Sequence, residues 1–474
     1  MRMSYGPFRP DAAGPNSGYA AVADSVLPQA AAGGIGYGPM PTLVTATGAA
    51  ALSGAPRGMI TGFKADGSYA VIAATASTIE LMNSSYQWSN IEIGRTVTSG
   101  DDVSFAQFGK YVLNTDTTSG LKAYDIDGGG ANTAVSAITS ARCVFTCNNV
   151  VFIGGTTSNN RRMQSSAIGD HTNWTTEGAD GKTFEDGGAI VGGRDLKNGA
   201  AVLFQETAIR LIQFGGGPGL YTVAKVADGR GAVSDRSIVA FDGMCFYLST
   251  DGFYKFTLNG GNEPIGAEKV NRWLADQISA SDYENVSGAV DPFEKVVWWR
   301  ISSTLLLGYD WQLNEFFTAT VTTSALSRLA TAAVTIDSLS GTIDALDVTI
   351  DSRLLAGGSL LFGALDGSYK FSTFTGTSLA ATLQTCSMAG PNLVMVNRCT
   401  PDSDSANATI ALGVSDNRHT ALTWKAAASK TTSGRVGLRG TGKVFALKET
   451  IPAGETWTYA TGIEDIEMAA GGVR

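Results

Sequence analysis

The sequence predicts an all-β protein whose main part is a β-propeller of six to eight blades. Short apolar or alternating runs separated by Gly, Asp, Asn and Ser fill residues 57–321, as in antiparallel strands in series. Groups of three or four such runs recur about every 40 residues, the spacing of propeller blades. Helical periodicity is nearly absent from this region. A run of two-sheet sandwiches would give the same texture and remains an alternative at this point.

The propeller is predicted to occupy residues 57–381. Several strands follow directly on a tight turn, such as Asp66-Gly67 or Asn148-Asn149, as the arms of hairpins do. The predicted strands are residues 69–73, 110–113, 150–153, 201–204, 208–212, 244–248, 252–256, 295–299, 360–364 and 369–374.

The same apolar runs predict the core, because one face of each strand must be buried against a neighbouring sheet. We expect these side chains to be buried and helices to make up less than about a fifth of the chain. The predicted core residues are Phe105, Val112, Phe152, Phe204, Ile209, Phe246, Tyr254, Trp298 and Trp299.

One helix is predicted among the strands, at residues 268–278. Val270, Trp273, Leu274 and Ile278 fall on one face of it, while charged residues occupy the other positions. We expect the apolar face to pack against the edge of a sheet.

An insertion with a seven-residue repeat is predicted at residues 325–358. It repeats a Thr-Ile-Asp unit three times. The β-branched residues disfavour a helix, whereas the spacing of Ile and Leu favours one, so the sequence does not decide the local structure. Four acidic residues lie here with no Lys or Arg between them, and burying them unpaired would be costly. We expect an acidic cluster that faces water, either in a channel or on an outer rim. A calcium site is disfavoured because the alternating oxygen ligands with a central Gly are absent. The cluster is Asp337, Asp344, Asp347 and Asp351.

Residues 382–474 are predicted to form a small C-terminal β domain, or a long insertion, that also closes the propeller. Alternating runs at residues 393–396 and 444–447 are typical of strands.

Composition argues against several classes of protein. The net charge of −9 disfavours a protein that holds nucleic acid over its whole surface, because that affinity needs clustered Lys and Arg. The five cysteines are odd in number and form no CxxC pair, and the first residues lack an apolar signal core, so we expect synthesis in a reducing cytoplasm. No run approaches the roughly 18 apolar residues of a membrane span.

The sequence contains no convincing phosphate-binding loop. The motif Gly181-Lys182-Thr183 resembles the end of a P-loop, but Thr176 stands where the loop needs glycine. The glycine-rich residues 34–38 and 215–219 do not join a strand to a helix, and they are predicted to be flexible turns.

Catalytic and metal-binding constellations are not evident either. His171 and His419 lie far apart in sequence, which limits imidazole chemistry. Cys143 and Cys147 are interpreted as small core side chains. Carboxylates such as Glu206, or Glu185 with Asp186, are of the type that glycosidases use, but nothing indicates that two converge. We predict no catalytic, cofactor-binding or metal residues, no cofactor and no enzymatic activity.

Several motifs carry a resemblance to a known family. They are Gly36-Tyr37-Gly38-Pro39-Met40-Pro41, Gly231-Ala232-Val233-Ser234, Asp251-Gly252-Phe253-Tyr254, Ala289-Val290-Asp291-Pro292 and Val297-Trp298-Trp299. With their order and spacing, the chain resembles the tail nozzle family of short-tailed bacteriophages, also called tail tubular protein B or packaged-DNA-stabilisation protein. The resemblance implies that residues 1–56 form an extended N-terminal arm ahead of the first blade.

The resemblance also implies a function. Such a protein is a structural subunit of a homo-oligomeric ring, a hexamer, that attaches below the portal and adaptor proteins and contacts tail fibre or needle proteins. The ring forms the channel for retention and ejection of double-stranded DNA, and the protein resides in the virion tail after synthesis in the host bacterium. The alternatives are a receptor-binding or glycan-degrading phage tail protein and a cellular propeller that serves as an interaction platform.

Overall fold

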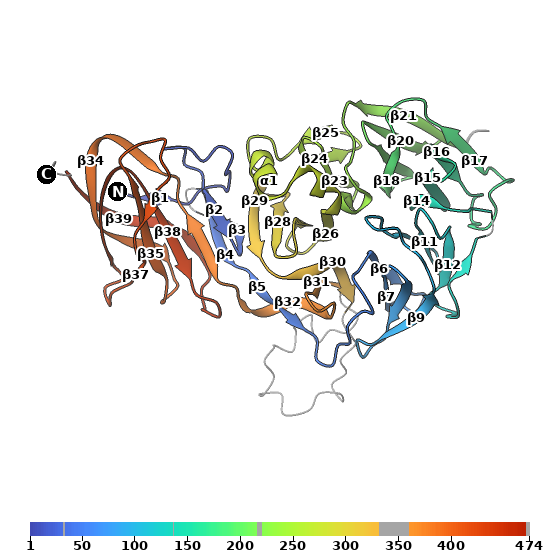
Figure 1. Ribbon diagram of the computed structural model, residues 1–474, viewed down its shortest axis with the longest axis horizontal. Coiled ribbons are helices and arrows are strands. Elements are labelled where there is room, and N and C mark those ends of the chain that lie inside the picture. Colours follow the sequence, from blue (N-terminus) through green and yellow to red (C-terminus); the bar gives the residue numbers. More distant parts are fainter. Residues whose placement is uncertain (32–33, 136, 216–219, 331–359, 471–474) are drawn as a thin grey trace.

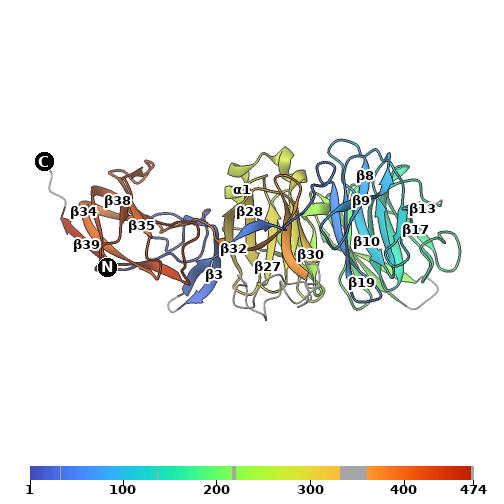
Figure 2. The same ribbon diagram turned by 90° about the horizontal axis from the view of Figure 1, so that it is seen from below.

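The computed structural model describes residues 1–31, 34–135, 137–215, 220–330 and 360–470. Strands account for 55% of these described residues and helices for 4%, so the prediction of an all-β chain with little helix is confirmed. The molecule is elongated, with a ring of β-sheets at one end and long C-terminal strands at the other (Figures 1 and 2).

Five separate four-stranded antiparallel sheets follow one another in the chain and form blades of the ring (Figure 1). Each blade is a simple meander, as the short runs and turns of the sequence predict. The strands are β6 (Gly58–Phe63), β7 (Tyr69–Ala74), β8 (Thr78–Met82), β9 (Trp88–Ile93), β10 (Ser104–Phe108), β11 (Tyr111–Thr115), β12 (Lys122–Asp125), β13 (Thr133–Ala134), β14 (Ala141–Cys147), β15 (Val150–Thr156), β16 (Asn159–Ser165), β17 (Asp180–Thr183), β18 (Ile190–Asp195), β19 (Ala200–Gln205), β20 (Ala208–Phe214), β21 (Tyr221–Asp228), β22 (Val239–Phe241), β23 (Met244–Ser249), β24 (Gly252–Thr257) and β25 (Gly261–Pro264).

The sixth separate blade combines both halves of the chain. It consists of β30 (Thr323–Ala330), β31 (Leu360–Asp366), β32 (Phe371–Ser378) and β5 (Pro41–Thr45), in that order. The ring is therefore closed by a strand of the N-terminal arm, and the prediction that C-terminal residues close it is wrong. Pairing β5 with β32 removes an open sheet edge that would otherwise face solvent. Six separate blades lie within the predicted six to eight.

A further meander, β26 (Ser287–Asp291) to β29, occupies the place in the ring between β22 and β30 but continues into a 15-stranded sheet. Strand β2 of the arm pairs with β29 on one side and with β33 on the other, so the sheet runs on into the C-terminal domain. Its other strands are β27 (Val296–Arg300), β28 (Leu305–Asp310), β29 (Glu315–Thr320), β1 (Met3–Ser4), β2 (Val22–Asp24), β3 (Val26–Ala31), β4 (Gly34–Pro39), β33 (Ala381–Gln384), β34 (Met388–Ser403), β35 (Thr409–Ser415), β36 (Thr423–Trp424), β37 (Ala428–Ser429), β38 (Val436–Ile451) and β39 (Ala460–Ala470).

Two boundary predictions need correction. Residues 325–330, assigned to the insertion, belong to β30, because they pair in register with residues 360–365 of β31. Residues 34–38, expected to be a flexible turn, lie in strand β4 (Gly34–Pro39), which pairs with β3 along its length. The glycines of β4 have no side chain, which lets neighbouring segments approach this strand closely. A Cβ at Gly38, for example, would collide with the side chain of Gln29.

The predicted helix exists but is shorter. Helix α1 spans Asn271–Gln277, with Leu274 buried and Trp273 packed against the core. It begins late because Glu268 has a φ of 59°, outside the helical region. The carboxylate of Asp11, in the arm, accepts from the backbone N–H groups of Arg272 and Trp273 and so caps the helix. Two short 3-10 helices, η1 (Asp235–Ser237) and η2 (Ala280–Asn285), complete the helical content of the described residues.

The core prediction is confirmed for eight of the nine residues, with Phe105 only partly buried. The largest apolar cluster extends from Phe253 and Trp299 in the propeller, through Phe8 in the arm, to Leu447 and Ile463 in the C-terminal strands. One continuous sheet and one continuous apolar cluster therefore join one side of the propeller to the C-terminal strands.

Candidate functional site

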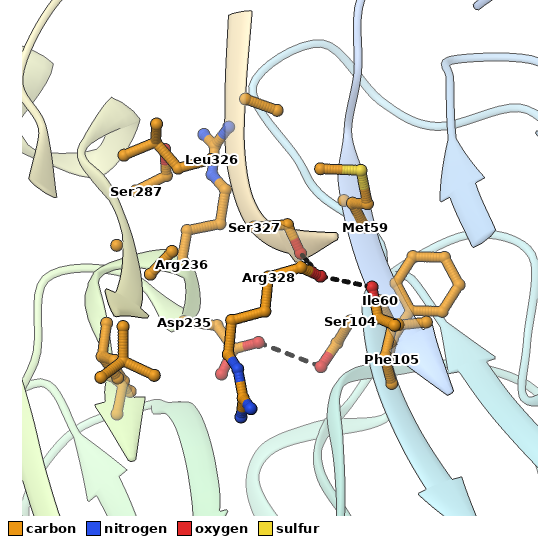
Figure 3. Close-up of a pocket in the computed structure, with 18 of the residues that line it drawn as sticks. Met59, Ile60, Ser104, Phe105, Asp235, Arg236, Ser287, Leu326, Ser327 and Arg328 are labelled. Carbon is orange, nitrogen blue, oxygen red and sulfur yellow. Dashed lines mark hydrogen bonds between the residues drawn. The ribbon is translucent and has the colours of Figure 1, made fainter. Parts of the chain in front are cut away.

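The first candidate site is a cavity at the centre of the ring, called here the central channel. It has a volume of about 370 Å³ and is lined by β6, β10, β22, β26 and β30 together with Arg194 at β18 (Figure 3). These strands come first in their blades, and neighbouring ones contact each other around the ring. Because it is bounded by strands of several blades, the channel brings together side chains far apart in sequence.

Arginines and aspartates meet in the central channel. Arg194 donates to Asp235 across 2.6 Å, and Ser104 donates to the other oxygen of the same carboxylate across 3.0 Å (Figure 3 draws the Ser104 bond). Arg236 forms an ion pair with Asp102, whose side chain is 19% exposed. These contacts connect the segment that precedes β22 to Arg194 in β18, to Ser104 in β10 and to Asp102 just before β10.

Burial shifts the pKa values of an aspartate and two arginines in and around the channel. Desolvation raises the pKa of Asp102 to about 7, although Arg236 and Arg57 oppose the shift. Desolvation also lowers the pKa of Arg300 and of Arg328. The Arg328 side chain forms no ion pair with a described residue, and its Nε atom is buried without a hydrogen-bond partner.

The second candidate site is residues 417–448, called here the basic segment. It contains seven Lys and Arg and no Asp or Glu. The other 27 Lys and Arg and all 43 Asp and Glu lie outside it, so the rest of the chain carries a net charge of −16. The segment runs from the loop after β35 through β36 and β37 into β38.

Five cations of the basic segment face solvent and form no ion pair with a described residue. In β38, Arg439 and Lys443 are exposed while Val436, Leu438 and Val444 are buried, so the two charges share one face of the strand. Four residues of strand place them about 13 Å apart. The five exposed cations are Arg418, Lys425, Arg435, Arg439 and Lys443.

The remaining two cations are held by the protein. Lys448 lies over the ring of Trp424, with its Nζ atom 4.4 Å from the ring centroid. Lys430 donates to the backbone oxygen of Ser405 across 2.6 Å and to that of Ser403 across 3.1 Å. The basic segment thus combines exposed charge with a half-buried indole, a composition that suits contact with nucleic acid.

The acidic cluster predicted from the sequence, Asp337, Asp344, Asp347 and Asp351, lies outside the described residues, as do residues 216–219 of the second glycine-rich run. Gly181-Lys182-Thr183 lies in strand β17 and is exposed, in a place unlike the loop before a helix that binds phosphate.

The two histidines lie apart. His171 is half-buried against the ring of Tyr111, with 4.3 Å between centroids, and burial lowers its pKa. His419 is exposed in the basic segment. Cys143 and Cys147 are buried in β14, which fits the interpretation as core side chains, and burial raises the pKa of the Cys147 thiol to about 12.

Two of the carboxylates considered for glycosidase chemistry make contacts within the structure. Asp186 pairs with Lys225 and Arg210, which hold its pKa below the usual range, the reverse of what a general acid needs. Glu206 accepts from the backbone N–H of Ala189. Among the described residues, no group of three or more His, Cys, Asp and Glu is arranged to hold a metal ion. None of the helices described there is long and apolar enough to span a membrane.

Sequence reasoning missed both candidate sites. The basic segment was visible as a run of 32 residues without an acid, but the whole-chain charge of −9 concealed it. The arginines of the central channel had no such signal, because Arg194, Arg236 and Arg328 are separated by many residues of strand and turn.

No known family model matches the chain, and no curated protein sequence matches it. Solved structures of similar shape include the RRP9 WD40 repeats (10% identity, 61% of this chain and 88% of that one, TM-score 0.41) and a streptogramin B lyase (12%, 70% and 96%, 0.39). The Pan2 WD40 domain of Neurospora crassa is also similar (6%, 70% and 93%, 0.41). The β-propeller itself follows from the order and closure of the blades.

Proposed function

We propose that the protein is a structural subunit of a bacteriophage tail nozzle, a homo-oligomeric ring below the portal and adaptor proteins that retains and releases packaged DNA. The observation that carries the proposal is the basic segment. A set of exposed cations without ion pairs, in a 32-residue stretch that lacks acidic residues, concentrates the capacity for phosphate contact in one region of a chain that is otherwise strongly acidic. Such a surface holds DNA locally while the remaining surface repels it, as retention and release both require.

The central channel argues for passage between subunits. Its volume of about 370 Å³ is that of a small-molecule pocket, and paired arginines and aspartates cross it. A duplex would therefore pass through an opening enclosed by several copies of the protein. The continuous 15-stranded sheet and shared core suit a wall that must resist deformation during DNA passage.

The proposal places the protein in the virion tail, after synthesis in the cytoplasm of the host bacterium. Its neighbours would be the head-tail adaptor and the tail fibre or needle proteins, and its role is structural, without catalysis or cofactor. The sequence motifs that resemble the nozzle family support this assignment.

A DNA-binding measurement tests the proposal. We expect a fluorescently labelled duplex to bind the purified protein, with an affinity that falls steeply as salt rises. The variant Arg435→Gln, Arg439→Gln, Lys443→Gln removes three exposed charges from β38 and the residue before it. It should bind at least about tenfold more weakly and lower the salt slope by roughly 2 to 3.

A matched control is available on the outer strands of the third blade. Arg161, Arg162 and Lys182 are exposed, and the corresponding triple Gln variant makes the same change in net charge. It should retain most of the affinity for DNA. Equal losses in the two triple variants, or no binding of DNA at low salt, would contradict the proposal. Binding to a glycan array that depends on the same β38 residues would instead favour a receptor-binding tail protein.

A further inference from the structure

We propose that the central channel is a binding site for a small oxyanion, such as phosphate or a small carboxylate. This inference is independent of the proposed function, because it rests on the residues inside the propeller and on none of the basic segment.

One of the arginines that line the channel has no ion-pair partner among the described residues. The lining contains Arg194, Arg236 and Arg328. Arg194 pairs with Asp235, and Arg236 pairs with Asp102. The Arg328 guanidinium forms no ion pair with a described residue, although the charge of Asp291 acts on it.

Arg328 is the centre of the proposed site. Its backbone is fixed in β30, where the carbonyl accepts from the hydroxyl of Thr61 in β6. Figure 3 shows its side chain, together with those of Asp235 and Ser104, among the residues that line the cavity. The Nε atom of Arg328 is buried and has no hydrogen-bond acceptor. Desolvation lowers the pKa of the same side chain, so its charged form lacks stabilising contacts.

An oxyanion would supply the missing acceptors. A guanidinium presents several N–H groups in a fork that matches two oxygens of a carboxylate or phosphate. Ser287 also lines the cavity, and its hydroxyl is a donor of the kind that binds such oxygens. The hydroxyls of Ser324 and Ser327 line it too, but they already donate to the backbone oxygens of Asp366 and Arg328. A volume of about 370 Å³ admits a small anion with its waters and excludes a polymer.

Inorganic phosphate is the first probe. At constant ionic strength, replacing chloride with about 10 mM phosphate should raise the melting temperature of the full chain by about 2–4 °C, since binding to the folded state alone stabilises it. Calorimetric titration should give one site per chain. Arg328→Gln should weaken phosphate binding by about tenfold or more, while Arg328→Lys, which keeps the charge without the fork, should lose part of it.

The control is Arg162→Gln, which removes one positive charge from an exposed position of β16, outside both candidate sites, and should leave phosphate binding unchanged. An Arg328→Gln protein that binds phosphate as tightly as the parent overturns the proposal, and so does loss of binding in Arg162→Gln alone. A crystal soaked in tungstate reports on the parent protein without any substitution. An anomalous peak beside Arg328 supports the site, whereas peaks confined to the outer surface overturn it.

Discussion

Two carboxylates, one partly and one fully buried, show how single residues connect distant parts of this molecule. Asp102 pairs with Arg236, which lines the central channel, and Glu449 lies wholly inside the C-terminal strands. Glu449 accepts from the hydroxyl of Tyr5 and from that of Ser403, the latter across 2.6 Å, and burial raises its pKa. Each carboxylate joins segments that are distant in sequence, so its loss should lower the free energy of unfolding of the whole fold.

Asp102 should make stability depend on pH. Its pKa is raised from 3.8 to about 7 in the fold, so its stabilising contribution is complete below about pH 4 and is lost as pH rises through 7. Arg236, Arg57, Asp235 and Asp101 are the charges that face it. Between about pH 4 and pH 7, the free energy of unfolding of the parent should fall with rising pH more steeply than that of Asp102→Asn. The difference between the two slopes should be about 1.4 kcal/mol per pH unit.

Chemical denaturation at a series of pH values measures this difference. The exposed Asp276, replaced by Asn, is the control and should follow the parent curve. Parallel curves for Asp102→Asn and the parent would show that the carboxyl titrates normally.

The hydrogen bond from Tyr5 to Glu449 should stabilise the attachment of the arm. Tyr5→Phe removes the hydroxyl and leaves a buried carboxyl oxygen without that donor, which should lower the unfolding free energy by about 1–3 kcal/mol. Tyr459→Phe, at a residue 43% exposed in the same domain, should change it little. Urea denaturation of the two variants provides the comparison, and equal stabilities would refute a structural role for the bond.

At the scale of elements, strands of the N-terminal arm connect the propeller with the C-terminal domain. Strand β5 completes the last blade, β2 joins that end of the propeller to the C-terminal domain, and β1 pairs with β39. Three short strands of one arm thus connect the whole molecule, and each would be an isolated extended segment without its partner.

A disulfide across the closing pair tests this arrangement. Val44 in β5 lies directly opposite Thr373 in β32. Replacing both by Cys should allow a bond that closes a very long loop and stabilises the oxidised protein by about 2–4 kcal/mol over the reduced one. The five native cysteines are buried and should not compete.

The melting temperatures of the oxidised and reduced forms measure the effect, and Val44→Cys alone should respond to neither oxidant nor reductant. Persistent free thiols in a folded double variant would mean that β5 does not lie against β32.

At the scale of the whole molecule, the separation of charge predicts assembly. A net charge of −16 outside the basic segment and seven cations within it allow attraction between copies as well as to DNA. If the chain forms a nozzle, we expect the purified protein to form rings, hexameric by the family resemblance, with a ring population that falls at about 1 M salt. Light scattering and negative-stain images measure this, and a monomer at every concentration and salt would contradict it.

The sequence by itself determined the β-propeller and most of its core. Runs such as Val150 to Phe152 and Val297 to Trp299 alternate or stay apolar between turns, and local hydrophobic pattern is enough to specify a strand. It also contained the basic segment, since a charge run needs no neighbours to be recognised.

Only the tertiary structure decided which strand closes the ring and what the channel contains. The pairing of β5 with β32 joins residues more than 300 positions apart. The sequence of an edge strand does not identify the strand with which it pairs. The same holds for Arg194, Arg236 and Arg328, each unremarkable in its own segment. Closing the ring turns the first strands of successive blades toward one axis, and this long-range geometry, invisible to local patterns, is what creates the central channel.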